Sequence, residues 1–286
     1  MRKINDILKK NNISGNRYRK NGKCIIIDNR YVIKPNKTNI YEYLNYRNFD
    51  NYPNIVIDDG YEIIDYIPSI DIPTEQKMID LINIISILHK KTTYYKKISE
   101  FELDKIYNSV KDKISSVKNI YDNLITKAES SIYMSPYEYL LARNISFVYS
   151  MIEYSNNNIE LWYKKIEDTD KVRVSVIHNN LSLEHFINNT LISWDNSKVS
   201  LPIFDLYKLY LTTYNEYDWN ELINIYSNNY PLKEDELVLF NTLISIPLVP
   251  SISNIEIDNV KDINEKLNYL KVTNNYIFTK KDEIKI

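Results

Sequence analysis

The side chains best suited to chemistry lie close together in one stretch, residues 172–210, with the sequence VRVSVIHNNLSLEHFINNTLISWDNSKVSLPIFDLYKLY. It holds the imidazoles of His178 and His185 and the carboxylates of Asp195 and Asp205. Such groups can bind a metal ion or move protons. A metal site made of His178, His185 and Asp195 is disfavoured, because a loop separates the two histidines and no supporting residues can be identified.

The elements that position these side chains follow from the local sequence. The β-branched run 172–177 predicts a strand that ends at His178, and residues 190–194 predict a second short strand. Pro202 is typical of the first turn of a helix. That helix would carry one apolar face, made of Ile203, Leu206, Leu209 and Tyr210. The polar residues therefore lie on loops between buried elements, where binding and catalytic residues are common.

Three motifs in this stretch resemble one family: His178-Asn-Asn-Leu-Ser-Leu-Glu-His185, Leu191-Ile-Ser-Trp-Asp195 and Pro202-Ile-Phe-Asp205-Leu. The chain is similar here to the aminoglycoside phosphotransferases and choline kinases, and most of all to their spore-coat branch of CotS and YutH type. The resemblance implies an α+β, bilobal protein-kinase-like fold. Residues 1–66 would form the N-lobe, a five-stranded antiparallel sheet plus one helix. Residues 67–286 would form a mostly helical C-lobe with a degenerate catalytic loop at 178–195.

The chain departs from the family pattern H-G-D-x-x-x-x-N at the positions that do chemistry. The resemblance puts Asn180 at the catalytic base, His185 at the metal-binding asparagine and Ser193 at the second metal-binding aspartate. An asparagine amide takes up no proton at neutral pH, and serine brings no negative charge to magnesium, which prefers carboxylates. No catalytic residue is therefore expected. His178 and Asp205, scaffold positions in the family, are retained and are expected to support the loop.

Turn chemistry alone predicts the N-terminal elements. Asn21-Gly22 and Asp28-Asn29 are hairpin signals, because their residues reach positive φ readily. The predicted elements are strands over 16–20, 23–27 and 30–34, a helix over 38–49, and a hairpin of 54–57 and 61–66 around Asp58-Asp59-Gly60. This order of three strands, one helix and two strands is that of a kinase N-lobe.

Two residues would contact a nucleotide if ATP binds. By the resemblance, Lys34 falls at the phosphate-contacting lysine, and Glu42 lies on the helix that carries its partner. The alternative interpretation is a solvated lysine and a surface glutamate. Asp195 could replace the lost metal-binding aspartate after a small shift in register. The Asn21-Gly22 turn is too short to reach over a triphosphate, and no glycine-rich loop replaces it.

Helical periodicity dominates beyond residue 70. The predicted helices cover 74–89, 101–127, 136–154, 159–166, 203–210, a segment from 218, 234–246 and 260–270, with a loop at Asn156-Asn157-Asn158. His89 would lie at a helix end, where the helix dipole favours a basic group. The 26 tyrosines are expected to serve mostly in packing.

Composition excludes several classes of function. The net charge of −2 argues against nucleic-acid binding, which needs a basic surface. Cys24 is the only cysteine, so no disulfide is expected, and its strand position predicts an inert core residue. The first residues lack the apolar segment of a signal peptide, and no apolar run is long enough to span a bilayer. We therefore expect a cytoplasmic protein. The abundance of Ile, Asn and Lys is typical of an AT-rich, bacterial genome.

Two functions remain. The first is a pseudokinase that binds or scaffolds a protein partner, in the setting of a spore coat, with no cofactor. The second is a small-molecule, ATP-dependent phosphotransferase with a non-standard metal site, in which Lys34, Glu42 and Asp195 would serve ATP and magnesium. Binding of ATP with magnesium distinguishes the two.

Overall fold

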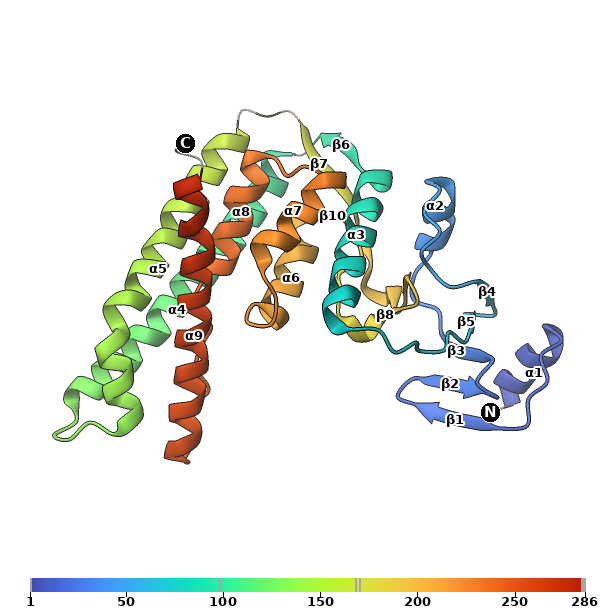
Figure 1. Ribbon diagram of the computed structural model, residues 1–286, viewed down its shortest axis with the longest axis horizontal. Helices are drawn as coiled ribbons and strands as arrows, with labels where there is room; N and C mark the ends of the chain where they lie inside the picture. The colour runs from blue at the N-terminus through green and yellow to red at the C-terminus, as the bar shows by residue number, and fades with distance from the viewer. Residues whose placement is uncertain (1, 98, 168, 170, 284–286) are drawn as a thin grey trace. The chain divides into compact units, whose positions relative to one another are not determined.

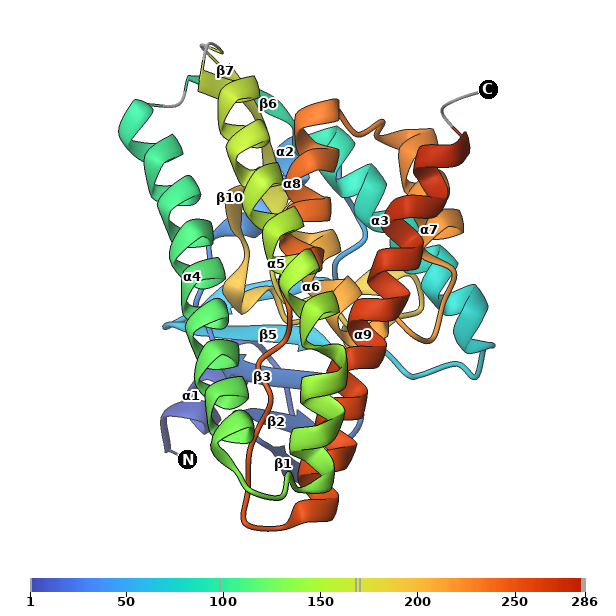
Figure 2. The same ribbon diagram turned by 90° about the vertical axis from the view of Figure 1, so that its left-hand side faces the viewer.

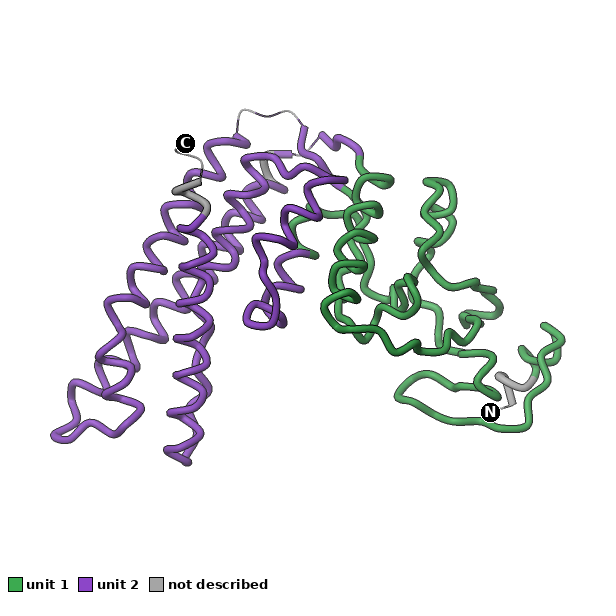
Figure 3. Tube along the Cα trace, in the orientation of Figure 1, with its two compact units in different colours: residues 1–93, 175–205 green, residues 94–174, 206–286 purple. Residues whose placement is uncertain are grey.

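The computed structural model describes residues 2–97, 99–167, 169 and 171–283. Contacts within the chain divide it into two compact units, residues 1–93 with 175–205 and residues 94–174 with 206–286 (Figure 3). The expected lobe boundary at residue 66 lies inside the first unit, because the segment 175–205 packs with the sheet and with the helix that follows it. No helix in the described part of the chain is both long and apolar enough to cross a bilayer.

The first unit is built on a five-stranded antiparallel sheet with the strand order β1-β2-β3-β5-β4 (Figure 1). Its strands are β1 (Tyr18–Asn21), β2 (Cys24–Ile27), β3 (Tyr31–Pro35), β4 (Ile55–Asp58) and β5 (Tyr61–Asp65). The predicted meander and hairpin are therefore present. The central turn residues of the first hairpin are Gly22 and Lys23, one position later than predicted, because Asn21 pairs with Cys24. Gly22 has a positive φ of 57°, which glycine adopts at little cost.

The helix α1 (Arg2–Lys10) covers one face of this sheet and was not predicted from the sequence. Ile7 and Leu8 from α1 form a core with Ile27, Ile33 and Ile63 from three strands. The side chains of Ile27 and Ile33 alternate with those of Ile26 and Lys34, which lie on the opposite face. Helix α1 therefore covers the face of the sheet opposite to Lys34.

The first unit also contains helices and short strands outside this sheet. They are α2 (Ile40–Tyr46), α3 (Thr74–Thr92), β8 (Phe186–Ile187), β9 (Thr190–Leu191), β10 (Lys198–Ser200) and two 3-10 helices (Leu183–His185 and Trp194–Asn196). The helix α2 is shorter than the predicted 38–49, although Thr38 Oγ1 does accept a hydrogen bond from the Ile40 N–H at 3.2 Å. The last residues of β7 (Lys171–Ile177) pair with β10.

The second unit is predominantly helical. It contains α4 (Glu100–Ser130), α5 (Pro136–Glu167), most of α6 (Ile203–Thr213), α7 (Trp219–Asn229), α8 (Glu234–Ser245), α9 (Glu256–Glu283) and β6 (Tyr94–Lys97), which pairs with the first half of β7. Figure 2 shows α4 beside α5, which also packs against α8 and α9. Tyr210 is fully buried among Trp219, Phe240, Tyr269 and Tyr276, as expected for packing tyrosines.

The predicted loop at Asn156-Asn157-Asn158 is wrong, because α5 runs through it without a break. Ser155 and Ile159 on either side are completely buried. The Asn158 amide donates to the Tyr154 carbonyl within the helix at 2.8 Å. Burial of the helix face thus outweighs the low helix propensity of three asparagines, which costs up to about 0.7 kcal/mol each, or roughly 2 kcal/mol together.

Candidate functional site

The loop after β7 is held by one buried carboxylate, that of Asp205. Its Oδ2 accepts the His178 backbone N–H at 2.7 Å, and its Oδ1 accepts the Asn179 backbone N–H, also at 2.7 Å. Asp205 lies on the first turn of α6 and is inaccessible to solvent. Asn179 has a positive φ of 62°, and the backbone N–H groups of residues 178 and 179 both point toward the carboxylate. The geometry is that of an anchor for the loop.

His89 gives the same carboxylate a third partner. Its Nε2 lies 3.3 Å from Asp205 Oδ2, and the side chain is fully buried. His89 lies in the last turn of α3, as predicted, but its imidazole is buried within the unit and contacts Asp205, which the sequence did not predict. The signal that sequence reasoning missed was the position of His89 on the apolar face of α3, beside Leu88 and Ile85.

The His178 imidazole supports the second half of the loop. Its Nε2 lies 2.8 Å from the Ile192 carbonyl, so this nitrogen carries the proton. The ring also packs edge-on against Trp194 with the centroids 4.8 Å apart. Burial lowers the pKa of His178, against the raising effect of Asp205. A neutral, buried imidazole bonded to backbone is a structural residue and a poor proton acceptor for a substrate.

The charged centre of the site is Lys34, which lies between two carboxylates. Its Nζ is 3.2 Å from Glu62 Oε2 and 3.2 Å from both carboxylate oxygens of Asp195. Lys34 and Glu62 are directly opposite one another on β3 and β5, so the sheet register itself forms their pair. Lys34 is 7% exposed and Glu62 completely buried. The ammonium is therefore neutralised within the first unit.

The glutamate that pairs with Lys34 is Glu62, and not Glu42 on the helix as expected. Glu42 is exposed on α2. The residue of α2 that reaches the site is the preceding one, Tyr41, whose hydroxyl donates to Glu62 Oε2 at 3.3 Å. Glu62 was missed because the β3–β5 register joins strands distant in sequence. The available signal was a charged residue between the apolar residues of β5.

Burial changes the pKa values of Glu62 and Tyr41. It raises the pKa of Glu62 above its ordinary value, although Lys34 lowers it, and the neighbouring Asp195 adds to the rise. Burial also raises the pKa of the Tyr41 hydroxyl, which stays a hydrogen-bond donor at all ordinary pH values. Glu62 Oε1 has no hydrogen-bond partner in the described part of the chain. An unpaired, buried oxygen makes the charged form of Glu62 less favourable.

A cavity of about 460 Å³ adjoins Lys34. Its walls include Cys24, Ile26, Ile64, Lys34, His185 and Ser193. His185 and Ser193 thus face this space, whereas Asn180 does not line it. Cys24, expected in the core, is half-buried on the cavity wall, and burial raises the pKa of its thiol. The thiol therefore remains protonated at neutral pH, in line with an inert residue.

His185 and Ser193 were also singled out from the sequence. His185 Nδ1 lies 2.8 Å from the Asn180 carbonyl, and Ser193 has a positive φ of 66°. Among the described residues, no group of three or more His, Cys, Asp or Glu side chains could hold a metal ion. His178, His185 and Asp195 accordingly form no such group. The residues present also fit magnesium poorly. The carboxylate of Asp195 is already paired with Lys34. The side chains of Asn180, His185 and Ser193 offer no carboxylate to the ion.

The raised pKa of Glu62 predicts a pH dependence of stability. The folded protein binds this proton more tightly than the unfolded chain does, so the free energy of unfolding falls as the pH rises from about 4.5 through the raised pKa. Because glutamine does not titrate, Glu62→Gln removes this contribution to the pH dependence of the free energy of unfolding. Urea denaturation at pH 4 and pH 7 should show the variant gaining stability relative to the wild type at the higher pH. Glu42→Gln, an exposed control on α2, should follow the wild type. Parallel pH profiles for Glu62→Gln and the wild type would disprove the assignment.

Comparisons with known proteins show which solved structures share this fold. No protein-family model and no curated protein matches the sequence. Among solved structures, an aminoglycoside phosphotransferase from Alicyclobacillus acidocaldarius aligns with a TM-score of 0.70 and 8% identity over 94% of this chain and 92% of that chain. The AMP-bound spectinomycin phosphotransferase aligns with a TM-score of 0.53 and 13% identity over 97% and 98%. The predicted bilobal, protein-kinase-like α+β fold is confirmed, and at these identities the likeness extends to fold alone.

Proposed function

We propose that this chain is a pseudokinase of the aminoglycoside phosphotransferase type, which transfers no phosphate and acts by binding or scaffolding a protein partner. The observation that carries the proposal is the position of Lys34 between Glu62 and Asp195, at 3.2 Å from each. In phosphoryl transfer, such a lysine and the metal ions together neutralise the phosphates. Here the lysine already has two anionic partners, so a phosphate would meet two carboxylates and one cation.

The chemistry of the catalytic loop supports the same proposal. The base position is Asn180, whose amide cannot accept a proton from an attacking hydroxyl at neutral pH. The two metal positions are His185 and Ser193, and magnesium favours anionic oxygen ligands over both. No step of phosphoryl transfer can be assigned to these three side chains.

The short connection between β1 and β2 also supports the pseudokinase proposal. The β1–β2 connection has only two central residues, Gly22 and Lys23, because Asn21 and Cys24 already pair. A connection of this length cannot wrap several backbone N–H groups around a triphosphate. The defects thus lie on the sheet and on the catalytic loop, and one substitution should not repair both.

The experiment that tests the proposal is an ATP turnover assay on the whole chain with magnesium. We predict hydrolysis and transfer at background for the wild type and for Asn180→Asp, because restoring a base leaves the metal positions and Lys34 unchanged. Ser193→Asp combined with Asn180→Asp should remain at background too. Turnover by Asn180→Asp well above that of a heat-inactivated control would show that only the base is missing and would contradict the proposal.

A second candidate function rests on Asp195. This carboxylate lies two residues after Ser193, is 26% exposed and contacts Lys34, which would favour a phosphotransferase if Asp195 took over the role of the lost aspartate. Its engagement with Lys34 and the absence of a second carboxylate at Asn180 or His185 make us prefer the pseudokinase. The setting we propose is the bacterial cytoplasm, with later incorporation into a spore coat, on the resemblance within residues 178–205.

A further inference from the structure

The first hairpin of the sheet carries an unusual concentration of positive charge. Residues 16–30 hold five basic side chains, Arg17, Arg19, Lys20, Lys23 and Arg30, and one acidic one, Asp28, although the whole chain has a net charge of −2. All five basic residues are exposed. In the described part of the chain, none of their side chains has a hydrogen-bonded or ion-paired partner. One of these side chains, that of Arg19, also lines the cavity that adjoins Lys34.

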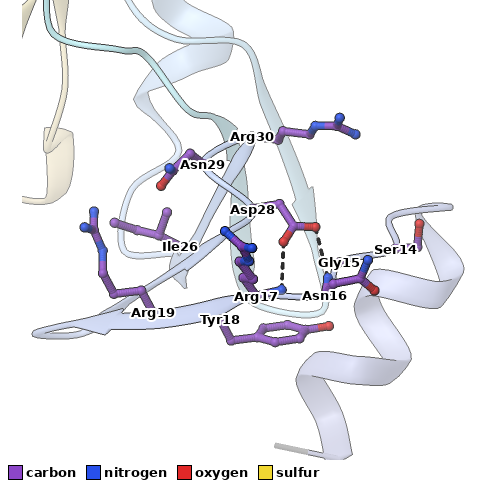
Figure 4. A pocket seen from close by; sticks show the side chains of 10 residues that line it. All are labelled: Ser14, Gly15, Asn16, Arg17, Tyr18, Arg19, Ile26, Asp28, Asn29 and Arg30. Carbon is purple, nitrogen blue, oxygen red and sulfur yellow. Dashed lines mark hydrogen bonds between the residues drawn. The ribbon is translucent and has the colours of Figure 1, made fainter.

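A cavity of about 580 Å³ lies against the same hairpin, and Arg17, Arg19 and Arg30 line it (Figure 4). Asp28 does not neutralise these arginines through a salt bridge. Its carboxylate instead accepts the backbone N–H groups of Asn16, at 3.0 Å, and Arg17, at 2.7 Å. These two bonds are the main cause of the lowered pKa of Asp28. The guanidinium groups are therefore free to meet an anion from outside the chain.

The strand that carries this charge is the edge of the sheet. β1 pairs with β2 alone. The Arg17 carbonyl accepts the Asp28 N–H at 2.9 Å, so the backbone of residue 17 faces β2. In an antiparallel pair this direction alternates, and the N–H and C=O groups of Tyr18 and Lys20 consequently face away from β2. Figure 4 shows Arg17 and Arg19 on one side of the strand and the Tyr18 ring on the other. Tyr18 is 53% exposed.

We propose that this basic edge, residues 17–23 with Arg30, docks an acidic, extended segment of a protein partner, which adds to the sheet beside β1. The backbone groups of Tyr18 and Lys20 would pair with the added strand, and the basic side chains would meet its carboxylates. Lysines on an edge strand also discourage association with ordinary strands. An acidic strand is the one that such an edge accepts. The proposal does not depend on whether ATP is turned over, because Tyr18 and Lys20, whose backbone groups would pair with the added strand, do not line the cavity beside Lys34.

The test uses the whole chain and a fluorescein-labelled, capped peptide of four Glu-Val repeats, followed by anisotropy at low salt. The double variant Arg17→Glu/Arg19→Glu should bind at least about tenfold more weakly, because each lost attraction becomes a repulsion. The double variant Lys105→Glu/Lys127→Glu makes the same change in charge at exposed positions of α4 and should bind within about twofold of the wild type. Far-UV circular dichroism verifies that both variants are folded.

A second pair of measurements separates strand addition from mere attraction between charges. A peptide of four Glu-Pro repeats has the same charge but lacks the N–H groups that a ladder needs, and it should lose at least tenfold in affinity. Lys20→Pro should bind more weakly than Lys20→Ala, because only proline removes the outward N–H. Equal affinity for the two peptides, or an unchanged Arg17→Glu/Arg19→Glu variant, would overturn the proposal. So would tighter binding of a single-stranded oligonucleotide or of phosphatidylserine vesicles than of the peptide at the same salt concentration.

Discussion

Asp205→Ala is expected to lower the free energy of unfolding by about 3–5 kcal/mol. The carboxylate is completely buried and accepts two backbone N–H groups, each at 2.7 Å, with His89 as a third partner. Alanine would leave these donors buried without an acceptor, and each orphaned buried donor costs about 1–3 kcal/mol.

The measurement is urea denaturation followed by tryptophan fluorescence, since Trp194 packs on His178 beside this loop. Asp218→Ala is the matched control. Asp218 also accepts a backbone N–H, that of Asn220 at 2.9 Å, but it caps α7 at an exposed position. Its loss should cost only about 0.5–2 kcal/mol. Equal losses for the two variants would mean that Asp205 is an ordinary cap and no anchor.

Lys34→Met should have an effect of similar size, about 3–5 kcal/mol, because it leaves the buried Glu62 carboxylate without a cation. The methionine side chain fills the space, so the loss reports charge and not a void. The double variant Lys34→Met/Glu62→Gln should recover most of the stability, since it removes both members of the pair.

Chemical denaturation of the wild type, both single variants and the double variant gives the coupling free energy of the pair. A Lys34→Met variant within about 1 kcal/mol of the wild type would mean that the ion pairs hold Lys34 only weakly and leave it available to a ligand. Strict additivity of the two single changes would lead to the same conclusion. Either result would remove the main support for the pseudokinase proposal.

The sheet could be predicted because its hairpins are local. Asp28 and Asn29 both have positive φ, as do Asp59 and Gly60, and these residue types identify such turns directly. The pairing of β3 with β5 is not local, and no turn fixes its register. The partner of Lys34 was consequently assigned to Glu42 on the helix, whereas the register places Glu62 opposite it.

The loop that follows β7 shows the same division between local and distant information. Its ends at His178 and Asp205 followed from motifs, and the backbone of one is bonded to the carboxylate of the other. The part played by His89 depends on α3, which lies far away in sequence, so no spacing could reveal it. The helix through Asn156-Asn157-Asn158 was missed for a related reason, because its stability comes from packing against other helices and not from propensity.

The most direct test of the central claim is isothermal calorimetry of the whole chain with ATP, in the presence and absence of magnesium. With Lys34 held by Glu62 and Asp195 and no carboxylate at residues 180, 185 or 193, we predict no measurable heat and no thermal shift from ATP with magnesium. Micromolar, magnesium-dependent binding that is lost in Asp195→Ala would contradict the account, because it would identify Asp195 as a working metal ligand and the protein as a phosphotransferase.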